Sequence, residues 1–190
     1  NAMADLNKAI EIDPYTSHSF SARGLLYFQQ KDYNTALADL DEAIRLDPYI
    51  EGNFINRGLI KYYLNDLRGA MADYDRVIEM DENNVIARFN RGLLRAQVAD
   101  NNRAIRDFDK VIELQPDNNI AYLNRAILNN EIGNSAGALD DINMVLEAHP
   151  DFFSGYFMRS QLKRGLNDLQ GAERDYNLAR NLEANAHTSS

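Results

Sequence analysis

Arginine and aspartate recur along the chain at a separation of sixteen residues. The five pairs are Arg23 and Asp39, Arg57 and Asp73, Arg91 and Asp107, Arg125 and Asp141, and Arg159 and Asp175. A guanidinium is a planar fork of N–H donors that matches the two oxygens of a carboxylate, so each pair can form a two-bond ion pair. Left unpaired, the arginines would instead be anion ligands. Because every arginine has its own aspartate, we favour a structural ladder of ion pairs.

Other residues that carry chemistry are few. The sequence has no cysteine, and its three histidines, His18, His149 and His187, share no spacing. This excludes disulfides, thiol nucleophiles and cysteine-based zinc sites, and scattered histidines do not make a metal site. Catalysis needs a nucleophile, a base and an orienting group placed together, and no such grouping is evident. We expect no enzyme activity, no cofactor and no metal.

The charge balance narrows the class of partner. The 190 residues include 20 Lys and Arg against 29 Asp and Glu, a formal charge of −9, which disfavours nucleic acid as a ligand. No stretch approaches the roughly 20 apolar residues that span a bilayer, and no leader peptide is evident, so we expect a soluble chain without membrane insertion. Asn1 and Ala2 ahead of Met3 resemble a tag remnant. The compartment, cytoplasmic or periplasmic, and any preceding repeats or domains therefore stay open.

The elements that position these residues repeat with a period of 34. Five segments align without a gap, beginning at Ser17, Glu51, Val85, Asn119 and Phe153. The eighth place of each repeat is small: Gly24, Gly58, Gly92, Ala126 and Ser160. The twentieth place is always alanine, and the twenty-fourth is large and apolar: Leu40, Tyr74, Phe108, Ile142 and Tyr176. Small residues at fixed places indicate close approach between helices.

Each repeat reads as a helical hairpin. Two segments of helical apolar spacing are separated by short polar links such as Lys31-Asp32 and Asn65-Asp66, and nothing favours a strand. Pro48, Pro116 and Pro150 end the second helix of three repeats, because proline cannot continue a helix. With the turn near place fifteen, places seven and twenty-three lie at similar height, which is where the arginines and aspartates stand.

This pattern resembles the tetratricopeptide repeat (TPR) family. The resemblance is carried by the small eighth residue, the alanine at place twenty, the closing proline and an aromatic at place four: Phe20, Phe54, Tyr122 and Tyr156. Departures are Arg88 in place of the third aromatic, and a place-eleven tyrosine that survives only as Tyr27. The resemblance implies an all-α, right-handed superhelical solenoid of helix-turn-helix repeats forming a single domain.

The repeat phase sets the predicted boundaries. Residues 1–16 match the second helix of a truncated repeat, followed by repeats at 17–50, 51–84, 85–118 and 119–152, a cap-like fifth repeat at 153–184, and a disordered tail at 185–190. The fifth repeat is cap-like because Glu173 and Arg180 replace apolar residues of the earlier repeats. The open N-terminal end would leave apolar surface bare, which makes a homodimer possible there.

The family resemblance also implies a concave groove lined by the first helix of each repeat. Place six carries Asn56, Asn90 and Asn124, whose amides can donate to and accept from a peptide backbone; the alternative is that they bond local backbone or water. Aromatic groove candidates are Phe28, Tyr62, Tyr63, Phe89 and Phe157. The family's clamp for acidic C-termini is not matched, since only one of its five positions, Asn56, agrees.

These features predict a scaffold or adaptor that binds an extended or helical segment of a partner protein in its groove. The expected guest is neutral or mildly basic with apolar side chains, given the net charge. Two alternatives remain open: a structural module for self-association or spacing, and a substrate-recruiting arm of a larger enzyme. The sequence does not name the partner, pathway, organism or oligomeric state.

Overall fold

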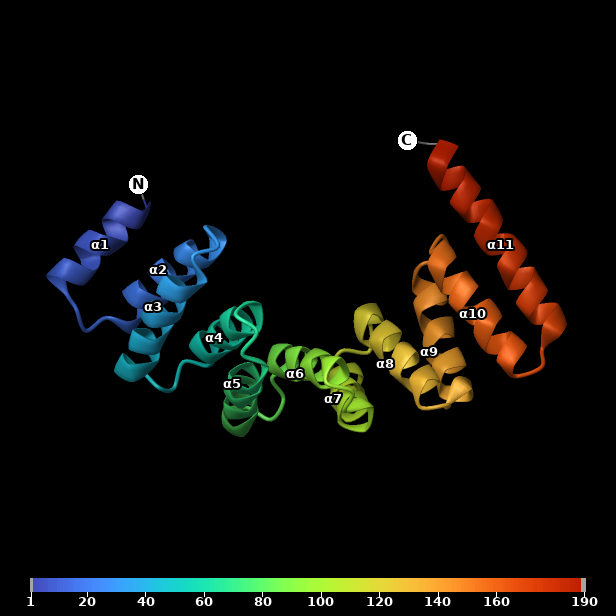
Figure 1. Cartoon of the computed structure of the whole chain (residues 1–190), viewed down its shortest axis with the longest axis horizontal. Coiled ribbons are helices and arrows are strands. Elements are labelled where there is room, and N and C mark those ends of the chain that lie inside the picture. Colours follow the sequence, from blue (N-terminus) through green and yellow to red (C-terminus); the bar gives the residue numbers. More distant parts are fainter. Residues whose placement is uncertain (1, 189–190) are drawn as a thin grey trace. The chain divides into compact units, whose positions relative to one another are not determined.

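Helices form almost the whole chain in the computed structural model, which describes residues 2–188 (Figure 1). No strand occurs within that range, so the predicted all-α class is confirmed. The helices are α1 (Ala2–Ile12), α2 (Ser17–Gln29), α3 (Tyr33–Leu46), α4 (Glu51–Tyr63), α5 (Leu67–Met80), α6 (Val85–Gln97), α7 (Asn101–Leu114), α8 (Asn119–Glu131), α9 (Ser135–Ala148), α10 (Phe153–Gly165) and α11 (Leu169–Thr188).

The helices divide into two units, Asn1–Leu94 and Arg95–Ser190, where the sequence analysis expects a single domain. The division falls inside α6. A repeat array has this property because each repeat contacts only its neighbours, so no one core unites the chain. Unit 1 and unit 2 are described separately below.

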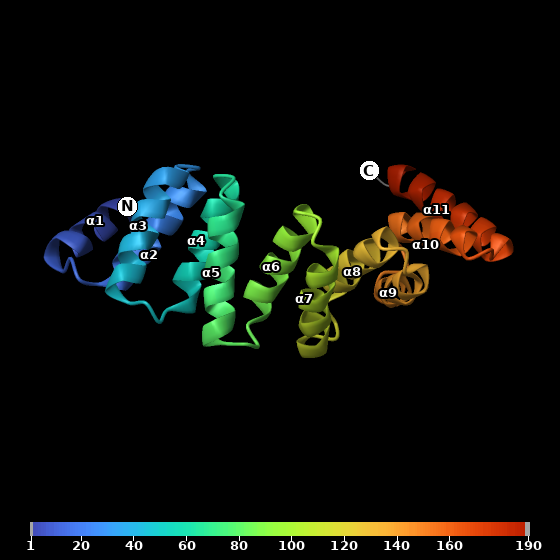
Figure 2. The ribbon, with the colours of Figure 1, turned by 60° about the horizontal axis from the view of Figure 1, so that its bottom comes forward.

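Within each unit, consecutive helices form hairpins. In unit 1, α2 packs on α3 and α4 on α5; in unit 2, α8 packs on α9 and α10 on α11 (Figure 2). The first helices α2, α4, α6, α8 and α10 begin at the five residues where the 34-residue repeats begin. The sequence period therefore coincides with the structural one.

Each hairpin turn contains two adjacent residues with different structural roles: the first reverses the chain and the second is the N-cap residue of the following helix. Place fifteen adopts a left-handed backbone with φ between 59° and 82° in all five repeats: Lys31, Asn65, Ala99, Gly133 and Asn167. The next residue caps the second helix, as where the Asp66 carboxylate accepts from the Gly69 N–H at 2.9 Å. This reverses the chain in a few residues and fixes the height at which facing side chains meet.

The predicted helix ends also follow backbone chemistry. Asp47, Gln115 and His149 each precede proline, and all three leave the helical region, with ψ of 101°, 82° and 76°. Helices α3, α7 and α9 end one residue earlier, at Leu46, Leu114 and Ala148. The clash of the proline ring with the preceding residue explains these ends.

Where a repeat and the next first helix lie in one unit, the core lies between the two helices of the repeat and that first helix. Leu40 is fully buried and clusters with Ile60, and Ile142 clusters with Leu162. The small residue at place eight admits the large one at place twenty-four. A Cβ added to Gly58 would lie 2.8 Å from the Tyr74 ring, so glycine there is a packing requirement.

The two ends of the chain differ from the repeats between them. Helix α1 has no buried residue, although Leu6 and Ala9 occupy the places at which Leu40 and Ala43 are fully buried. At the other end, α11 continues to Thr188, which corrects the predicted disordered tail for residues 185–188. Alanines 184 and 186 favour helix, and no Gly or Pro stops it. Residues 189 and 190 lie outside the described range. No helix in residues 2–188 is long and apolar enough to cross a membrane.

Candidate functional site

The arginines and aspartates of the predicted ladder meet inside the repeats. Arg23 donates through Nε and Nη2 to the two carboxylate oxygens of Asp39, at 2.8 and 2.7 Å. The same two-bond geometry joins Arg57 to Asp73, Arg125 to Asp141 and Arg159 to Asp175.

The remaining two ladder residues belong to different units. In unit 1, Arg91 donates to Asp75 at 2.7 Å. In unit 2, Asp107 accepts from Arg95 at 2.7 Å.

Each ladder arginine also reaches the preceding second helix. Arg57 Nη1 donates to Asp41 at 2.8 Å, and Arg125 Nη1 donates to Asp109 at 2.7 Å. Equivalent bonds run from Arg23 to Asn7 and from Arg159 to Asn143, both at 2.9 Å. The arginines therefore join neighbouring repeats as well as the two helices of one repeat.

The flat face of four of these guanidinium groups is occupied too. Arg23, Arg57, Arg125 and Arg159 lie 5.1–5.6 Å from the centroid of the place-four aromatic ring of the same helix. The N–H groups of each guanidinium are bound to carboxylates and its flat face lies against an aromatic ring. These arginines therefore have few free donors with which to bind an outside anion. Their geometry fits a structural role.

Residues at place eleven of the repeats also bind the ladder aspartates, which was not predicted from the sequence. Lys61 and Lys163 bind Asp73 and Asp175 at 2.8 Å, where the family pattern has tyrosine. Asn129 donates to Asp141 at 3.3 Å from the same place. A polar residue four positions after four of the five arginines was the available signal, since residues four apart share a helix face: Lys61, Arg95, Asn129 and Lys163.

The aspartates of the ladder are buried, with exposed fractions of 1–5%. Burial of Asp175 opposes its charge, yet hydrogen bonds from Arg159 and Lys163 outweigh burial and hold its pKa below the ordinary value. On the cation side, the hydrogen bond with Asp141 raises the pKa of Arg125, with a further bond to Asp109 adding to it. Both shifts favour the charged form of the residue concerned, Asp175 as the carboxylate and Arg125 as the cation.

Three of the predicted groove aromatics gather at one end of the α2–α5 hairpins in unit 1. Tyr63 stacks on Tyr33 at 5.2 Å between ring centroids, and it meets Phe28 edge-on at 5.4 Å. Tyr62 contacts Tyr63 at 5.7 Å. Tyr62 and Tyr63 remain 41% and 52% exposed, so this aromatic cluster presents apolar surface on a preordered base.

The three predicted asparagines differ in their hydrogen bonds. Asn124 donates to the Ile120 carbonyl of its own helix at 2.7 Å, which is the local alternative left open by the sequence. The half-buried side chains of Asn56 and Asn90 make no hydrogen bond to another described residue. Asn56 and Tyr63 are seven residues apart on α4 and so share one face, and Asn90 stands at the equivalent place of α6.

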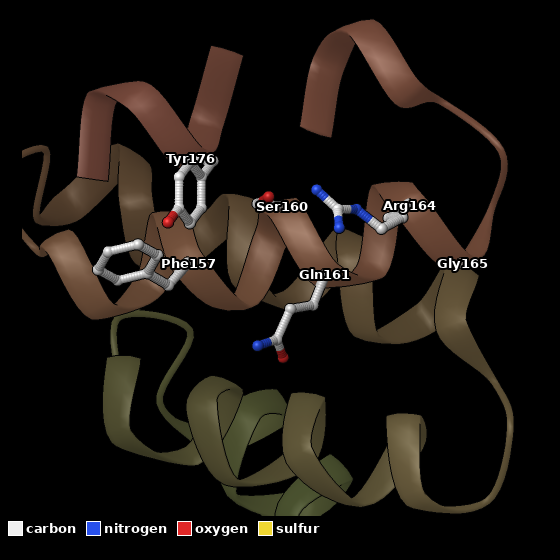
Figure 3. Close-up of a pocket in the computed structure, with 6 residues that line it drawn as sticks. All are labelled: Phe157, Ser160, Gln161, Arg164, Gly165 and Tyr176. Carbon is white, nitrogen blue, oxygen red and sulfur yellow. The ribbon is translucent and has the colours of Figure 1, made fainter. Parts of the chain in front are cut away.

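The remaining two aromatics belong to different units. Phe89 is half-buried on the unit 1 part of α6. In unit 2, Phe157 lies edge-on to Tyr176 at 5.6 Å and lines a cavity of about 460 Å³ between α10 and α11 (Figure 3). No group of three potential metal ligands occurs in residues 2–188.

Three tetratricopeptide repeat models match the sequence, over residues 19–49, 53–84 and 93–152. The chain belongs to the tetratricopeptide repeat family. Its predicted membership and helical-repeat fold are thereby confirmed. A tetratricopeptide array of this kind is a protein–protein interaction module, and the fold is typically a non-catalytic scaffold.

Solved structures of similar fold cover nearly the whole chain. MamA aligns with a TM-score of 0.82 at 15% identity, covering 87% of this chain and 96% of its own. A MamA fragment from Desulfovibrio magneticus RS-1 gives a TM-score of 0.82 at 14% identity, covering 89% and 96%. YrrB, described as a TPR protein with an unusual peptide-binding site, gives 0.83 at 16% identity, covering 94% and 92%. At these identities the likeness concerns the fold. The comparison with curated proteins gave no match.

Proposed function

We propose that the chain is a scaffold or adaptor module that binds an extended or helical segment of a partner protein on its first-helix face. This face is defined in unit 1 by Phe28, Asn56, Tyr62, Tyr63, Phe89 and Asn90. The observation that carries the proposal is the exposed aromatic pair Tyr62 and Tyr63 on the same helix as Asn56, whose amide has no described partner. YrrB, which has a similar fold and is described as having a peptide-binding site, adds support.

The chemistry of this face suits a peptide with apolar side chains. Aromatic rings held by other rings bury a guest side chain without first losing much rotamer freedom. A primary amide can donate to and accept from one peptide unit, which would hold a main chain regardless of its sequence. Unit 2 offers Asn124 and Phe157 for the same purpose, although the Asn124 amide would first have to leave Ile120.

The guest is expected to be neutral or mildly basic, because the chain carries a charge of −9. The function is binding without catalysis. The most regular charged residues of the chain are held by one another in the ladder, and such groups are poorly placed to act on a substrate.

The proposal is tested by selecting peptides from a random display library and measuring their affinity by fluorescence anisotropy. Relative to the wild type, Tyr62→Ala and the pair Asn56→Ala, Asn90→Ala are expected to weaken binding by about tenfold or more, since hot-spot truncations typically cost over ~1.4 kcal/mol. Tyr49→Ala is the matched control, because Tyr49 is 78% exposed but lies in the loop before α4. Equal losses in all variants, or selection of acidic peptides alone, would contradict the proposal.

A second candidate function, self-association, is favoured by the bare face of α1. Leu6, Ala9 and Ile10 are only partly covered, whereas the same places are buried in α3. If copies of the chain pair through this face, sedimentation velocity will show a dimer in the wild type and a monomer in Leu6→Asp. Lys8→Asp, at an exposed position of α1, is the control and should leave the dimer intact. A wild-type chain that stays monomeric at high concentration would exclude this candidate.

A further inference from the structure

Four of the five hairpin turns contain a side chain that caps the second helix by accepting from the backbone N–H three residues further on. The capping residues are Asp32, Asp66, Asn134 and Asp168, at 3.2, 2.9, 3.1 and 2.9 Å from the N–H groups of Thr35, Gly69, Gly137 and Gly171. The first turn of a helix leaves its N–H groups without partners inside the helix, so a cap of this kind holds the helix end closed.

The exception is Asp100, which stands at the same place before α7 but makes no side-chain cap. Its carboxylate accepts instead from Arg103 at 3.3 Å, in an exposed ion pair of the kind that contributes little to stability. The residue three positions on explains the difference. A Cβ added to Gly69 would overlap the Asp66 carboxylate, so glycine makes room for a close cap, whereas Arg103 has both a Cβ and a competing cation. The longest of the four caps is likewise the one whose donor, Thr35, has a Cβ.

The backbone of the same turn is also unfavourable. Ala99 has a φ of 59°, in the left-handed region that glycine and asparagine adopt more readily than alanine does. Three of the other turns have one of these residues there: Asn65, Gly133 and Asn167. The fourth has Lys31, but Asp32 caps the helix that follows it. Among the hairpin turns in residues 2–188, the α6–α7 turn therefore combines a poorly suited left-handed residue with an uncapped second helix.

The first residue of α7 adds a third weak point. Asn101 donates to the Glu131 carboxylate at 2.9 Å, but its buried Oδ1 has no hydrogen-bond partner in the described part of the chain. A buried acceptor without a partner keeps its desolvation cost, which favours any state in which water can reach it. The same place in α5 and α11 is leucine, Leu67 and Leu169, which has no polar side-chain group to satisfy.

Burial does not distinguish this turn from the others. No residue between Leu94 and Ala104 is buried, and the same holds between Ile60 and Ala70 at the α4–α5 turn. Opening either turn therefore uncovers little apolar surface, and the bonds within the turn decide how often it opens. The missing cap, the left-handed alanine and the unpaired Asn101 oxygen all weaken the α6–α7 turn.

We propose that the α6–α7 turn is a built-in opening point of the array, at which residues 97–103 unfold and refold locally while α7 stays folded from Ala104 onward. The segment lies within unit 2, close to the division of the chain at Leu94 and Arg95. A solenoid transmits order only through neighbouring repeats, so an opening point limits how far the order imposed at one repeat spreads along the chain. Because the opening needs no guest, it goes beyond the proposed function and does not depend on it.

Amide hydrogen exchange followed by mass spectrometry tests this opening point. After correction for intrinsic rates, residues 97–103 of the wild type should exchange about tenfold faster than residues 63–69, the equivalent segment of the α4–α5 turn. A factor of ten corresponds to about 1.4 kcal/mol, which lies within the range for a missing N-cap. Low concentrations of urea should leave the rate at 97–103 unchanged, because a local opening exposes little surface.

Two aspartate variants form a matched pair. Asp66→Ala removes a cap and should speed exchange at 63–69 by about fivefold or more, whereas Asp100→Ala removes only an exposed ion pair and should change the rate at 97–103 by less than about twofold. Ala99→Gly should slow exchange at 97–103 by about threefold, because glycine adopts the left-handed backbone readily. Ala96→Gly makes the same change at a helical residue of α6 and should not slow it.

Three results would overturn the opening point. Equal protection of residues 97–103 and 63–69 would show that the α6–α7 turn is as firmly closed as the capped one. A rate at 97–103 that rises with urea as steeply as that of the buried helices would mean that the segment exchanges only when the whole unit unfolds. If Asp100→Ala speeds exchange as strongly as Asp66→Ala does, Asp100 caps α7 in solution. No guest is present in these measurements, so they stand whether or not the first-helix face binds a peptide.

Discussion

Replacing Asp73 with alanine is expected to lower the free energy of unfolding by about 3–5 kcal/mol, the range for removing one partner of a buried ion pair. The Asp73 side chain is 4% exposed and accepts hydrogen bonds from Arg57 and Lys61. Its removal leaves two cations close together without their shared counter-charge. Both would retain part of their desolvation cost without the compensating attraction.

Asp41→Ala is the matched control, because Asp41 binds the same guanidinium of Arg57 but is 55% exposed. Exposed pairs contribute only about 0–1 kcal/mol, so this variant should unfold close to the wild type. Urea denaturation followed by circular dichroism measures both. Similar midpoints for the two variants would mean that the ladder aspartates do not hold the repeats together.

Two glycine-to-alanine changes in the same helix, α4, are expected to have opposite signs. Gly58→Ala should destabilise by about 1–3 kcal/mol, because its Cβ would lie 2.8 Å from the buried ring of Tyr74 and the packed core resists the shift. Gly52→Ala should stabilise by about 0.5–1 kcal/mol, since nothing lies within 4 Å of that Cβ and alanine favours helix.

Helix propensity favours alanine at both positions, so it cannot account for a loss of stability at Gly58. Thermal unfolding of the two variants, together with the Gly58→Ala, Tyr74→Leu double variant, separates the ring contact from other effects. Leucine has no ring at the contact and should recover part of the loss. Stabilisation by Gly58→Ala would show that Tyr74 moves freely, which would contradict the close packing of places eight and twenty-four.

Local chemistry explains why much of the fold was predictable. The helices begin where the repeats begin, the residues before Pro48, Pro116 and Pro150 leave the helix, and place fifteen turns the chain in every repeat. Each of these features depends on a few neighbouring residues, so it can be read from sequence. The spacing of arginine and aspartate followed from the same hairpin geometry, because the turn sets which places face each other.

The candidate sites depend on contacts that no local pattern encodes. The repeat phase predicts a groove position for Tyr62 and Tyr63, but only the packing of α3 against α4 brings the Tyr33 ring against Tyr63. Asn56, Asn90 and Asn124 occupy equivalent places in the sequence, yet only Asn124 donates to the backbone of its own helix. This difference depends on the side-chain rotamer, which the amino-acid type does not determine.

The repeat, its turns, its helix ends and its ion-pair register could be predicted from the amino-acid sequence, because they arise from short-range sterics and a strict 34-residue period. Three further features became evident only from the packing of the helices. The ladder arginines also bind the preceding repeat, place eleven contributes to the ladder, and Tyr176 stays 44% exposed beside a pocket. These properties follow from what packs on each helix, and a residue's neighbours from other helices exist only once the chain has folded.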